Sequence, residues 1–285
     1  QVSFLGLIVV GVTFVIISHG IDLSVGSQLA LGGVIAGFCV QWFWPLGLIV
    51  PPLVTGGIGL LNGLIITKWK LEPFIVTLAA LLSVRGLAFA ITNEKTVGIS
   101  DVPAFTWFGR GDLFGVRIPI LICLLAFLVG GIILTRTRYG KAIFAIGGDE
   151  DAARLMGVDV DRTKLIAYTV SGMLSGFAGA LLAARLSAGQ PVAGPGWELD
   201  AIASVVVGGT HVLKVLRRLH SGPSPEVEVG RHLAAVAASG TPAPVAPLAG
   251  WYELHDGDKT TTLGVLHELV PGALDAWALV LSALA

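Results

Sequence analysis

The chain has 285 residues, of which 54% are hydrophobic and only 13% are charged, and its mean hydropathy is +0.83. Soluble domains carry about 25% charged residues, so a large globular core is excluded as the main content of this chain. The formal net charge of −1 offers no basic surface for nucleic acid. Two cysteines, Cys39 and Cys123, lie inside apolar runs without metal-ligand spacing, which predicts buried, unreactive thiols and no metal site.

Six apolar runs have the composition of membrane-spanning helices, which need about 20 mostly apolar residues. A seventh run, at 201–210, stops after ten residues. The sequence therefore predicts an all-α polytopic membrane protein of about six spans and a truncated seventh, surrounded by membrane lipid. The chain opens inside an apolar run without an initiator Met or a signal-peptide n-region, so we expect it to be truncated at its start. The six predicted spans are residues 2–18, 27–44, 46–67, 74–92, 118–134 and 165–186.

Basic residues at the ends of the spans predict the orientation. Lys68 and Lys70 follow the third span, and the loop after the fifth span is also basic. The positive-inside rule places both loops in the cytoplasm. By alternation, residues 93–117 and 187–200 are expected on the outer face. The basic residues after the fifth span are Arg136, Arg138 and Lys141.

Small residues recur every four positions on two of the spans. Gly59 and Gly63 show this spacing in the third span. Such faces let helix backbones approach closely inside a membrane, so we expect the third and sixth spans to pack tightly. The corresponding residues of the sixth span form two rows, Gly172, Gly176 and Ala180, and Ser171, Ser175 and Gly179.

A few polar side chains fall at or near membrane depth, where an unpaired polar group is costly. Asn62 and Arg85 lie within predicted spans. Arg85 is the better candidate for a substrate contact, and a buried structural pair is an equal alternative. Asp22, beside Ser24 in GIDLSVGS, could cap the next helix or pair with a cation, and capping is the favoured alternative.

The polar stretch 135–165 interrupts the apolar pattern and predicts a short helix with clear ends. Asp149 suits the N-cap, and Glu150 follows at the positive end of the helix dipole with Asp151. Arg154 falls near the negative end, and Gly157 suits the left-handed position that ends a helix. A water-facing helix of two turns is too short to be a core element. We interpret it as a cytoplasmic handle.

Three segments, in the right order, resemble the membrane subunit of ribose-type ABC sugar importers. They are GIDLSVGS at 20–27, LEPFIVTLAALLSVRGLAF at 71–89, and 139–210, which runs from YGKAIFAIGGDEDAARLMGVDVDRTKL through ELDAIASVVVGGT. The resemblance covers 1–210, which we expect to be an incomplete permease domain. It implies a multi-pass protein of the bacterial cytoplasmic (inner) membrane that dimerises with a second copy or a close relative. It also implies that ribose, or another pentose, arrives from an extracytoplasmic binding protein.

The same resemblance gives the handle a role. Helix 149–156 would be the coupling helix, seated in a groove of a separate ATPase subunit that binds the ATP; the permease itself would hold no cofactor and do no bond chemistry. Closure of the ATPase pair would switch the spans between outward-open and inward-open packings. The expected coupling residues are Gly148, Asp149, Glu150, Ala152, Ala153, Arg154 and Gly157. The polar residues of the matching motifs are Asp22, Ser24, Asn62 and Arg85, and the candidates for lining the sugar path are Asn62, Arg85, Trp107 and Glu198.

Residues 211–285 do not follow this pattern, because no run in them could span a bilayer. Their periodicity predicts a small α+β unit, which resembles the N-terminal lobe of maltokinase, an enzyme that phosphorylates maltose with ATP. Lys214 in VLKVLRRL would hold ATP phosphates, and Glu228 in PEVEVGRHLA would be the helix glutamate. Glycine-rich strands and catalytic or metal-binding Asp residues are missing, so this incomplete fragment is expected to be inactive. The predicted elements are strands at 212–216, 245–254 and 260–267, and helices at 226–238 and 272–284.

The boundary between the two patterns falls at Thr210–His211, without a linker. A true fusion and an artefactual join of two reading-frame fragments are the two explanations, and we favour the join. Two rival functions are a sugar kinase with a mis-assigned N-terminus and a secondary transporter or channel that needs no ATPase.

Overall fold

The computed structural model describes residues 2–99, 102–113, 115–206, 211–215, 248–256 and 259–268. The chain divides into two units, Gln1–Val205 and Val206–Ala285, which are treated separately below.

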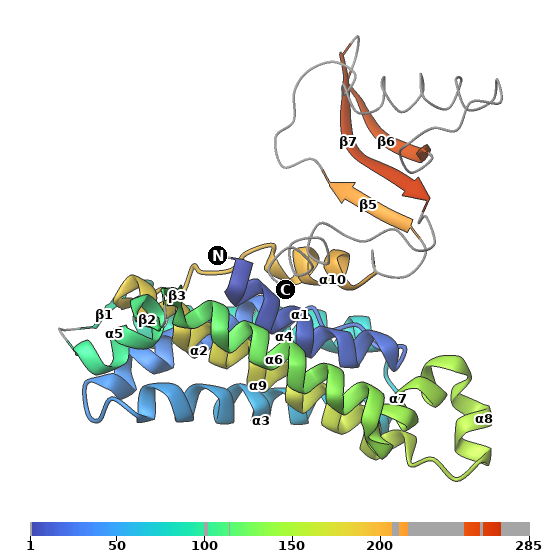
Figure 1. The fold of residues 1–285 in the computed structure, drawn as a ribbon, viewed down its shortest axis with the longest axis horizontal. Helices are drawn as coiled ribbons and strands as arrows, with labels where there is room; N and C mark the ends of the chain where they lie inside the picture. Colours follow the sequence, from blue (N-terminus) through green and yellow to red (C-terminus); the bar gives the residue numbers. More distant parts are fainter. Residues whose placement is uncertain are drawn as a thin grey trace. The chain divides into compact units, whose positions relative to one another are not determined.

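Six apolar helices of the first unit coincide with the six predicted spans (Figure 1). Four of them, α3, α4, α6 and α9, are long and apolar enough to cross a membrane. The other two, α1 and α2, have 16 residues each. At 1.5 Å per residue each would extend ~24 Å, less than the ~30 Å hydrocarbon core. The six helices are α1 (Val2–Ile17), α2 (Val25–Val40), α3 (Leu46–Trp69), α4 (Pro73–Thr92), α6 (Ile118–Arg136) and α9 (Val160–Leu186).

Helix α9 is the centre of the bundle, packed against α1, α2 and α3. Its small residues allow this, as the four-residue spacing predicts. A Cβ added to Gly32 of α2 would lie 2.7 Å from the Cα of Gly176, and one added to Gly63 of α3 would lie 3.1 Å from the Cα of Leu165. Backbones this close leave no room for larger side chains. The prediction that the third and sixth spans have small faces for close helix contact is confirmed, and the structure shows that these two spans pack against each other.

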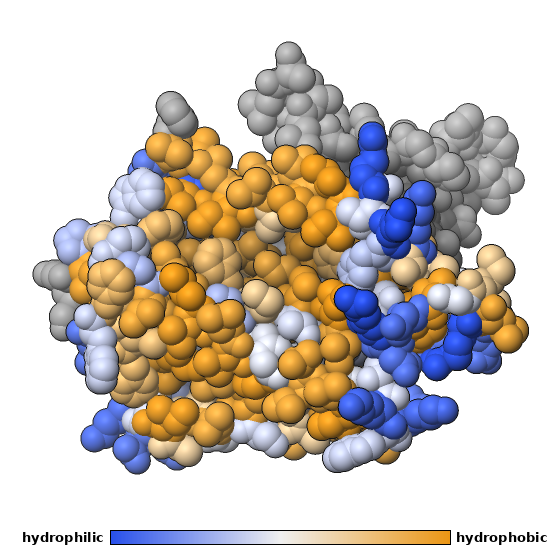
Figure 2. All heavy atoms as spheres, turned by 90° about the horizontal axis from the view of Figure 1, so that it is seen from below, coloured by the Kyte–Doolittle hydropathy of each residue, from blue (hydrophilic) through white to orange (hydrophobic). Residues whose placement is uncertain are grey.

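The outside of the bundle is apolar. Figure 2 shows hydrophobic residues over most of one face and hydrophilic residues gathered toward its ends. Leu53, Ile75, Leu82 and Leu128 are each at least 60% exposed. A soluble chain rarely exposes so large an apolar surface, whereas lipid tails cover it without cost. The described helices are therefore those of a polytopic membrane protein.

The two cysteines are only partly as predicted. Cys39 of α2 and Cys123 of α6 are free thiols, but both are half-buried rather than buried. Cys123 packs against α1, where its Sγ lies 2.6 Å from the position of a Cβ on Gly6. Helix α6 contacts the bundle along one side only, so its side chains are covered incompletely.

Short elements connect the spans. The loop predicted on the outer face contains α5 (Pro103–Arg110) and the hairpin of β2 (Asp112–Leu113) and β3 (Val116–Arg117). Strand β1 (Val97–Gly98) pairs with β4 (Ala188–Gly189), which follows α9. At the opposite end, α7 (Arg138–Gly148) and α8 (Glu150–Leu155) join α6 to α9. Helix α10 (Trp197–Val206) covers the start of the predicted seventh run.

In the second unit the described residues form an antiparallel sheet of order β5-β7-β6. The strands are β5 (His211–Val215), β6 (Leu248–Asp256) and β7 (Lys259–Glu268), close to the three predicted strands. Lys214 stands opposite Val265 in the register. Glu228 and the predicted helices at 226–238 and 272–284 lie outside the described residues. A three-stranded antiparallel sheet occurs in many folds, so the maltokinase resemblance stays a prediction.

Candidate coupling helix and polar sites of the bundle

Helix α8 has the predicted ends. Asp149 is the N-cap, with extended backbone angles (φ −158°, ψ 114°), and its Oδ1 accepts a 3.0 Å hydrogen bond from the amide of Ala152. At the other end Gly157 takes a left-handed conformation, φ +84°. The amide of Gly157 donates to the carbonyl of Arg154 at 3.1 Å, and that of Val158 donates to the carbonyl of Ala153 at 3.0 Å. This pair of bonds is a Schellman motif, which satisfies the last carbonyls of the helix.

One face of α8 is fixed to the protein. Ala153 is 5% exposed and packs with Ile146 of α7, Val158 and Val160 in a small apolar cluster. Because this cluster joins α7, α8 and the first residue of α9, the short helix is held from both sides. Sequence reasoning grouped Ala153 with the coupling residues; its side chain packs inside the protein, and a role in coupling stays a prediction.

Ion pairs add a second link between α8 and α9. Glu150 accepts from Lys164 of α9 at 2.5 Å and from Arg154 at 3.4 Å, and Arg154 also reaches Asp161 at 3.2 Å. Burial raises the pKa of Glu150, but Lys164 and Arg154 outweigh it and hold this pKa below its ordinary value. The carboxylate is therefore ionised at neutral pH.

The other face of α8 is open and partly apolar. Leu155 is 89% exposed and Met156 is 85% exposed, and Phe144 of the adjacent α7 is 52% exposed. These three side chains lie in the α7–α8 segment, outside the six spans, and their neighbours along the chain include exposed polar residues. Large apolar side chains exposed to water mark a surface that binds a partner. Sequence reasoning missed Leu155 and Met156, although two apolar residues ending a polar helix just before Gly157 were a usable signal.

The remaining predicted coupling residues are exposed to solvent. Unlike Ala153 and Glu150, they have solvent-exposed side chains or backbone: Gly148, Asp149, Ala152, Arg154 and Gly157.

A buried polar cluster lies where α1 and α2 meet. The Oδ1 of Asp22 accepts from the amide of Ser24 at 3.0 Å and from its hydroxyl at 2.5 Å. The Oδ2 of Asp22 accepts from the hydroxyl of Ser171 on α9 at 2.8 Å. Ser24, rather than Asp22, occupies the N-cap position of α2. The capping prediction for Asp22 is therefore wrong in detail: its short side chain closes the turn before the helix and ties that turn to α9.

Ser24 extends this cluster to α3. Its hydroxyl accepts from Asn62 Nδ2 at 3.2 Å and from Gln28 Nε2 at 2.6 Å. Asp22, Ser24 and Gln28 are fully buried and Asn62 is 4% exposed. Within the described residues no cation lies within ion-pair distance of Asp22. The cluster therefore joins the turn between α1 and α2 to α2, α3 and α9 through neutral donors.

Arg85 also has a structural partner. Its Nη1 donates to the backbone carbonyls of Pro191 at 3.0 Å and Ala193 at 2.5 Å. Glu198, in the first turn of α10, lies close enough to interact with Arg85 electrostatically, and its Oε1 accepts from the amide of Gly196 at 3.2 Å. The structure thus brings Arg85 and Glu198 into one neighbourhood, whereas Asn62 belongs to the cluster of Asp22. Trp107 lies in α5, half exposed, against the ring of Phe108.

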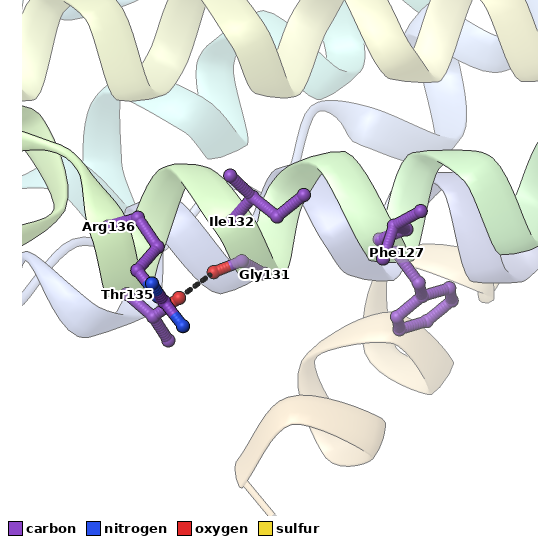
Figure 3. Close-up of a pocket in the computed structure, with 6 residues that line it drawn as sticks. Phe127, Gly131, Ile132, Thr135 and Arg136 are labelled. Carbon is purple, nitrogen blue, oxygen red and sulfur yellow. Dashed lines mark hydrogen bonds between the residues drawn. The ribbon is translucent and has the colours of Figure 1, made fainter.

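Figure 3 shows a surface hollow of about 620 Å³. All six residues that line it belong to α6, and its one side-chain hydrogen bond runs from Thr135 to the carbonyl of Gly131, at 2.7 Å. A furrow along a single apolar helix offers a sugar neither a facing wall nor several polar groups. We interpret it as part of the lipid-facing surface. Its residues are Phe127, Leu128, Gly131, Ile132, Thr135 and Arg136.

Comparison with known proteins adds the following findings. A family model described as "Branched-chain amino acid transport system / permease component" matches residues 1–239. "Ribose import permease protein RbsC" of Bacillus subtilis (strain 168) is 44% identical over 213 residues, which cover 74% of this chain and 66% of that protein. The protein of the same name in Escherichia coli (strain K12) is 42% identical over 221 residues, covering 74% and 67%.

A permease named for a different sugar is also similar to this chain. "Xylose transport system permease protein XylH" of Escherichia coli (strain K12) is 38% identical over 275 residues, covering 74% of this chain and 70% of that protein. The chain thus spans about two thirds of the length of these curated relatives. No solved structure matches the chain.

Proposed function

The chain belongs to the permease component family of branched-chain amino acid transport systems, and we propose that it is the membrane subunit of an ATP-driven importer of ribose or another pentose. The similarity to ribose and xylose permeases supports a pentose as the cargo. The ATP would be bound and hydrolysed by a separate cytoplasmic ATPase subunit. An extracytoplasmic binding protein would deliver the sugar, and a second permease copy would complete the path in the bacterial cytoplasmic membrane.

The observation that carries this proposal is the open face of α8. A channel or a secondary transporter has no need of an apolar surface in the water beyond its spans. Leu155 and Met156 form such a surface on a helix that is fixed to the protein along its opposite face. Exposed apolar side chains on a rigid support are suited to insertion into a groove of a partner.

The links of α8 suggest how a push on it would reach the spans. The pair of Glu150 and Lys164 joins α8 to the first turns of α9. Further along α9, Ser171 is bonded to Asp22 in the turn between α1 and α2. Movement of the handle would therefore displace α9 together with that turn. Packed helices change between discrete arrangements, so such a displacement favours a two-state switch.

Co-purification tests the partner. The permease would be co-expressed with a candidate ATPase subunit of a sugar importer, and the complex isolated through a tag on the permease. We expect a stable complex whose ATPase activity rises when the sugar-loaded binding protein is added. Leu155→Asp with Met156→Asp should remove the ATPase, whereas Leu113→Asp, an exposed leucine of the outer hairpin, should retain it. A complex that survives the double substitution would place the contact elsewhere.

The tail carries a separate prediction. We keep the proposal that 211–285 is a foreign, inactive fragment in which Lys214 and Glu228 are remnants of an ATP site; phosphate transfer from ATP to maltose by this chain would refute it. The family match runs past Thr210–His211 to residue 239 and does not itself mark a boundary at 210. The boundary therefore stays a prediction. Amplification across this junction from genomic DNA tests it, because a clean product of the expected length would rule out an artefactual join.

A further inference from the structure

Residues 187–196, hereafter the strap, connect α9 to α10. The strap contains no helix; two of its residues form β4, and the others are irregular. The sequence predicts an outer loop here, but the strap lies alongside α2. A Cβ on Gly189 would come within 2.9 Å of the Cα of Val34, and a Cβ on Gly194 would lie 3.2 Å from the carbonyl of Gly26. The contacts at Val34 and Gly26 are eight residues apart on α2, ~12 Å along its axis. The strap therefore runs along α2 from the middle of the helix, at Val34, to its first turn, at Gly26.

A non-helical segment at this depth must have its backbone groups satisfied by protein. At the outer end, the amide of Ile99 donates to the carbonyl of Ser187 at 3.0 Å, and β1 pairs with β4. Farther in, the partner is the guanidinium of Arg85, which binds the carbonyls of Pro191 and Ala193. Arg85 comes twelve residues after the start of the 20-residue α4, near the middle of that span. One side chain thus supplies the side-chain hydrogen bonds to the inner half of the strap, which also packs against the bundle through Ala193 and Gly194.

The strap closes the space between α2 and α9. The cavity left among these elements has a volume of about 10 Å³, and its lining includes Gly33, Gly179, Gln190 and Ala193. That is about the space of one water molecule, far less than a sugar needs. In this closed arrangement the Oε2 of Glu198 is buried and accepts no hydrogen bond from the described residues. Such an atom favours any movement that gives it a donor.

We propose that the strap is a gate on the outer half of the sugar path and that Arg85 is the positioning residue that latches it shut. The proposal rests on the proposed transport function. Opening the gate separates Arg85 from the two carbonyls. The freed N–H groups and carbonyls, together with the Glu198 carboxylate, then match the donor and acceptor hydroxyls of a pentose. Displacing the strap widens the 10 Å³ gap between α2 and α9.

Thiol labelling tests the latch directly. Ala193→Cys would be introduced after Cys39→Ala and Cys123→Ala, in the full complex in right-side-out membrane vesicles. A membrane-impermeant maleimide should label Cys at this position slowly while Arg85 is present, and at least tenfold faster with Arg85→Met. Arg85→Lys should restore slow labelling, because both hydrogen bonds come from a single nitrogen that an ammonium can replace. Equal rates in the parent and Arg85→Met would overturn the latch.

A cross-link tests the gate without removing Arg85, in case Arg85→Met fails to fold. Gly98 of β1 stands opposite Ala188 of β4, so Gly98→Cys with Ala188→Cys should form a disulfide that ties the strap to the outer loop. Oxidation should abolish pentose uptake, and reduction should restore it. The matched control is Leu113→Cys with Val116→Cys, a facing pair in the β2–β3 hairpin, which should leave uptake unchanged.

Full uptake with the first pair oxidised would overturn the gate. If the parent complex imports no pentose, the transport function fails, whereas the labelling rates still test the strap and its latch.

Discussion

The two ends of α9 are built in opposite ways. At its N-terminal end, α8 is fixed by a cap, a Schellman motif, an apolar cluster and three ion pairs. At its C-terminal end, the inner half of the strap accepts hydrogen bonds from one guanidinium. Redundant links make the first end a rigid handle, whereas at the second end the side-chain hydrogen bonds to the inner half of the strap all come from Arg85 and can be lost together. A transporter that is pushed from one side and opens at the other needs this difference.

The largest effect is expected at the handle's open face. Leu155→Asp with Met156→Asp places two charges where apolar contact with the ATPase is proposed. Burying an unpaired charge in an interface costs several kcal/mol, so ATP-driven uptake should fall by about 100-fold or more. Uptake by reconstituted complex measures this loss. The variant should keep the unfolding temperature of the parent permease, and a comparable loss of stability would show that these side chains support the fold instead.

The second-largest effect is expected at the buried polar cluster around Asp22, which lies between the two ends of α9. Asp22→Ala removes the acceptor of Ser24 and of Ser171, which leaves buried donors unsatisfied at a cost of ~3 kcal/mol. We expect a clear drop in thermal stability of the permease in detergent. Ser27→Ala serves as the control, since its hydroxyl only donates to the carbonyl of Ser24 within α2. Similar stabilities for the two variants would mean that Asp22 does not join the helices.

A smaller effect tests the end of α8. Gly157→Ala places a side chain at φ +84°, at a cost of ~1 kcal/mol. Gly148→Ala is the matched control, because both positions have open space for a Cβ but only Gly157 has a positive φ. Amides of α8 should exchange hydrogen roughly five- to tenfold faster in Gly157→Ala than in Gly148→Ala. Identical exchange rates in the two variants would show that the Schellman motif does not contribute to the rigidity of α8.

The ion pairs of α8 should contribute least. Glu150→Gln removes the charge from the links to Lys164 and Arg154 but keeps an amide oxygen that can accept a hydrogen bond. Lys164 is 12% exposed and Glu150 is 36% exposed, and pairs that solvent still screens are worth ~0.2–1 kcal/mol. Uptake should fall no more than about fivefold, with the ATPase still bound in co-purification. A loss as large as that of the double aspartate variant would move the main contact from Leu155 and Met156 to Glu150.

The pH dependence follows from the pKa of Glu150, which is lowered in the folded protein. A lowered pKa means that the carboxylate stabilises the fold above its unfolded pKa of about 4.3, and that this stability is lost as pH falls through the lower folded pKa. Exchange of the α8 amides should thus be constant between about pH 6 and 8, after correction for intrinsic rates, and accelerate only below about pH 4. Glu150→Gln should abolish the acid acceleration.

The sequence predicted the local features of this protein better than the contacts between residues far apart in the chain. Apolar runs predicted all six spans to within a few residues at most ends, because hydropathy alone determines them. The cap at Asp149 and the left-handed Gly157 were predictable because helix ends depend on local chemistry. The partners of Arg85 and Asp22 were not, since they lie 106 and 149 residues away along the chain. Alternation of the spans predicted an outer loop at 187–200 but could not show that residues 187–196 pack beside α2.

Proteoliposomes that contain the permease, the ATPase subunit and internal ATP provide the most direct test of transport. Labelled ribose would be added outside with the binding protein. The account predicts uptake that requires ATP, the binding protein and an intact Leu155–Met156 surface, and that stops when Gly98→Cys is cross-linked to Ala188→Cys. Ribose entry at the same rate without ATP or without the ATPase subunit would contradict it.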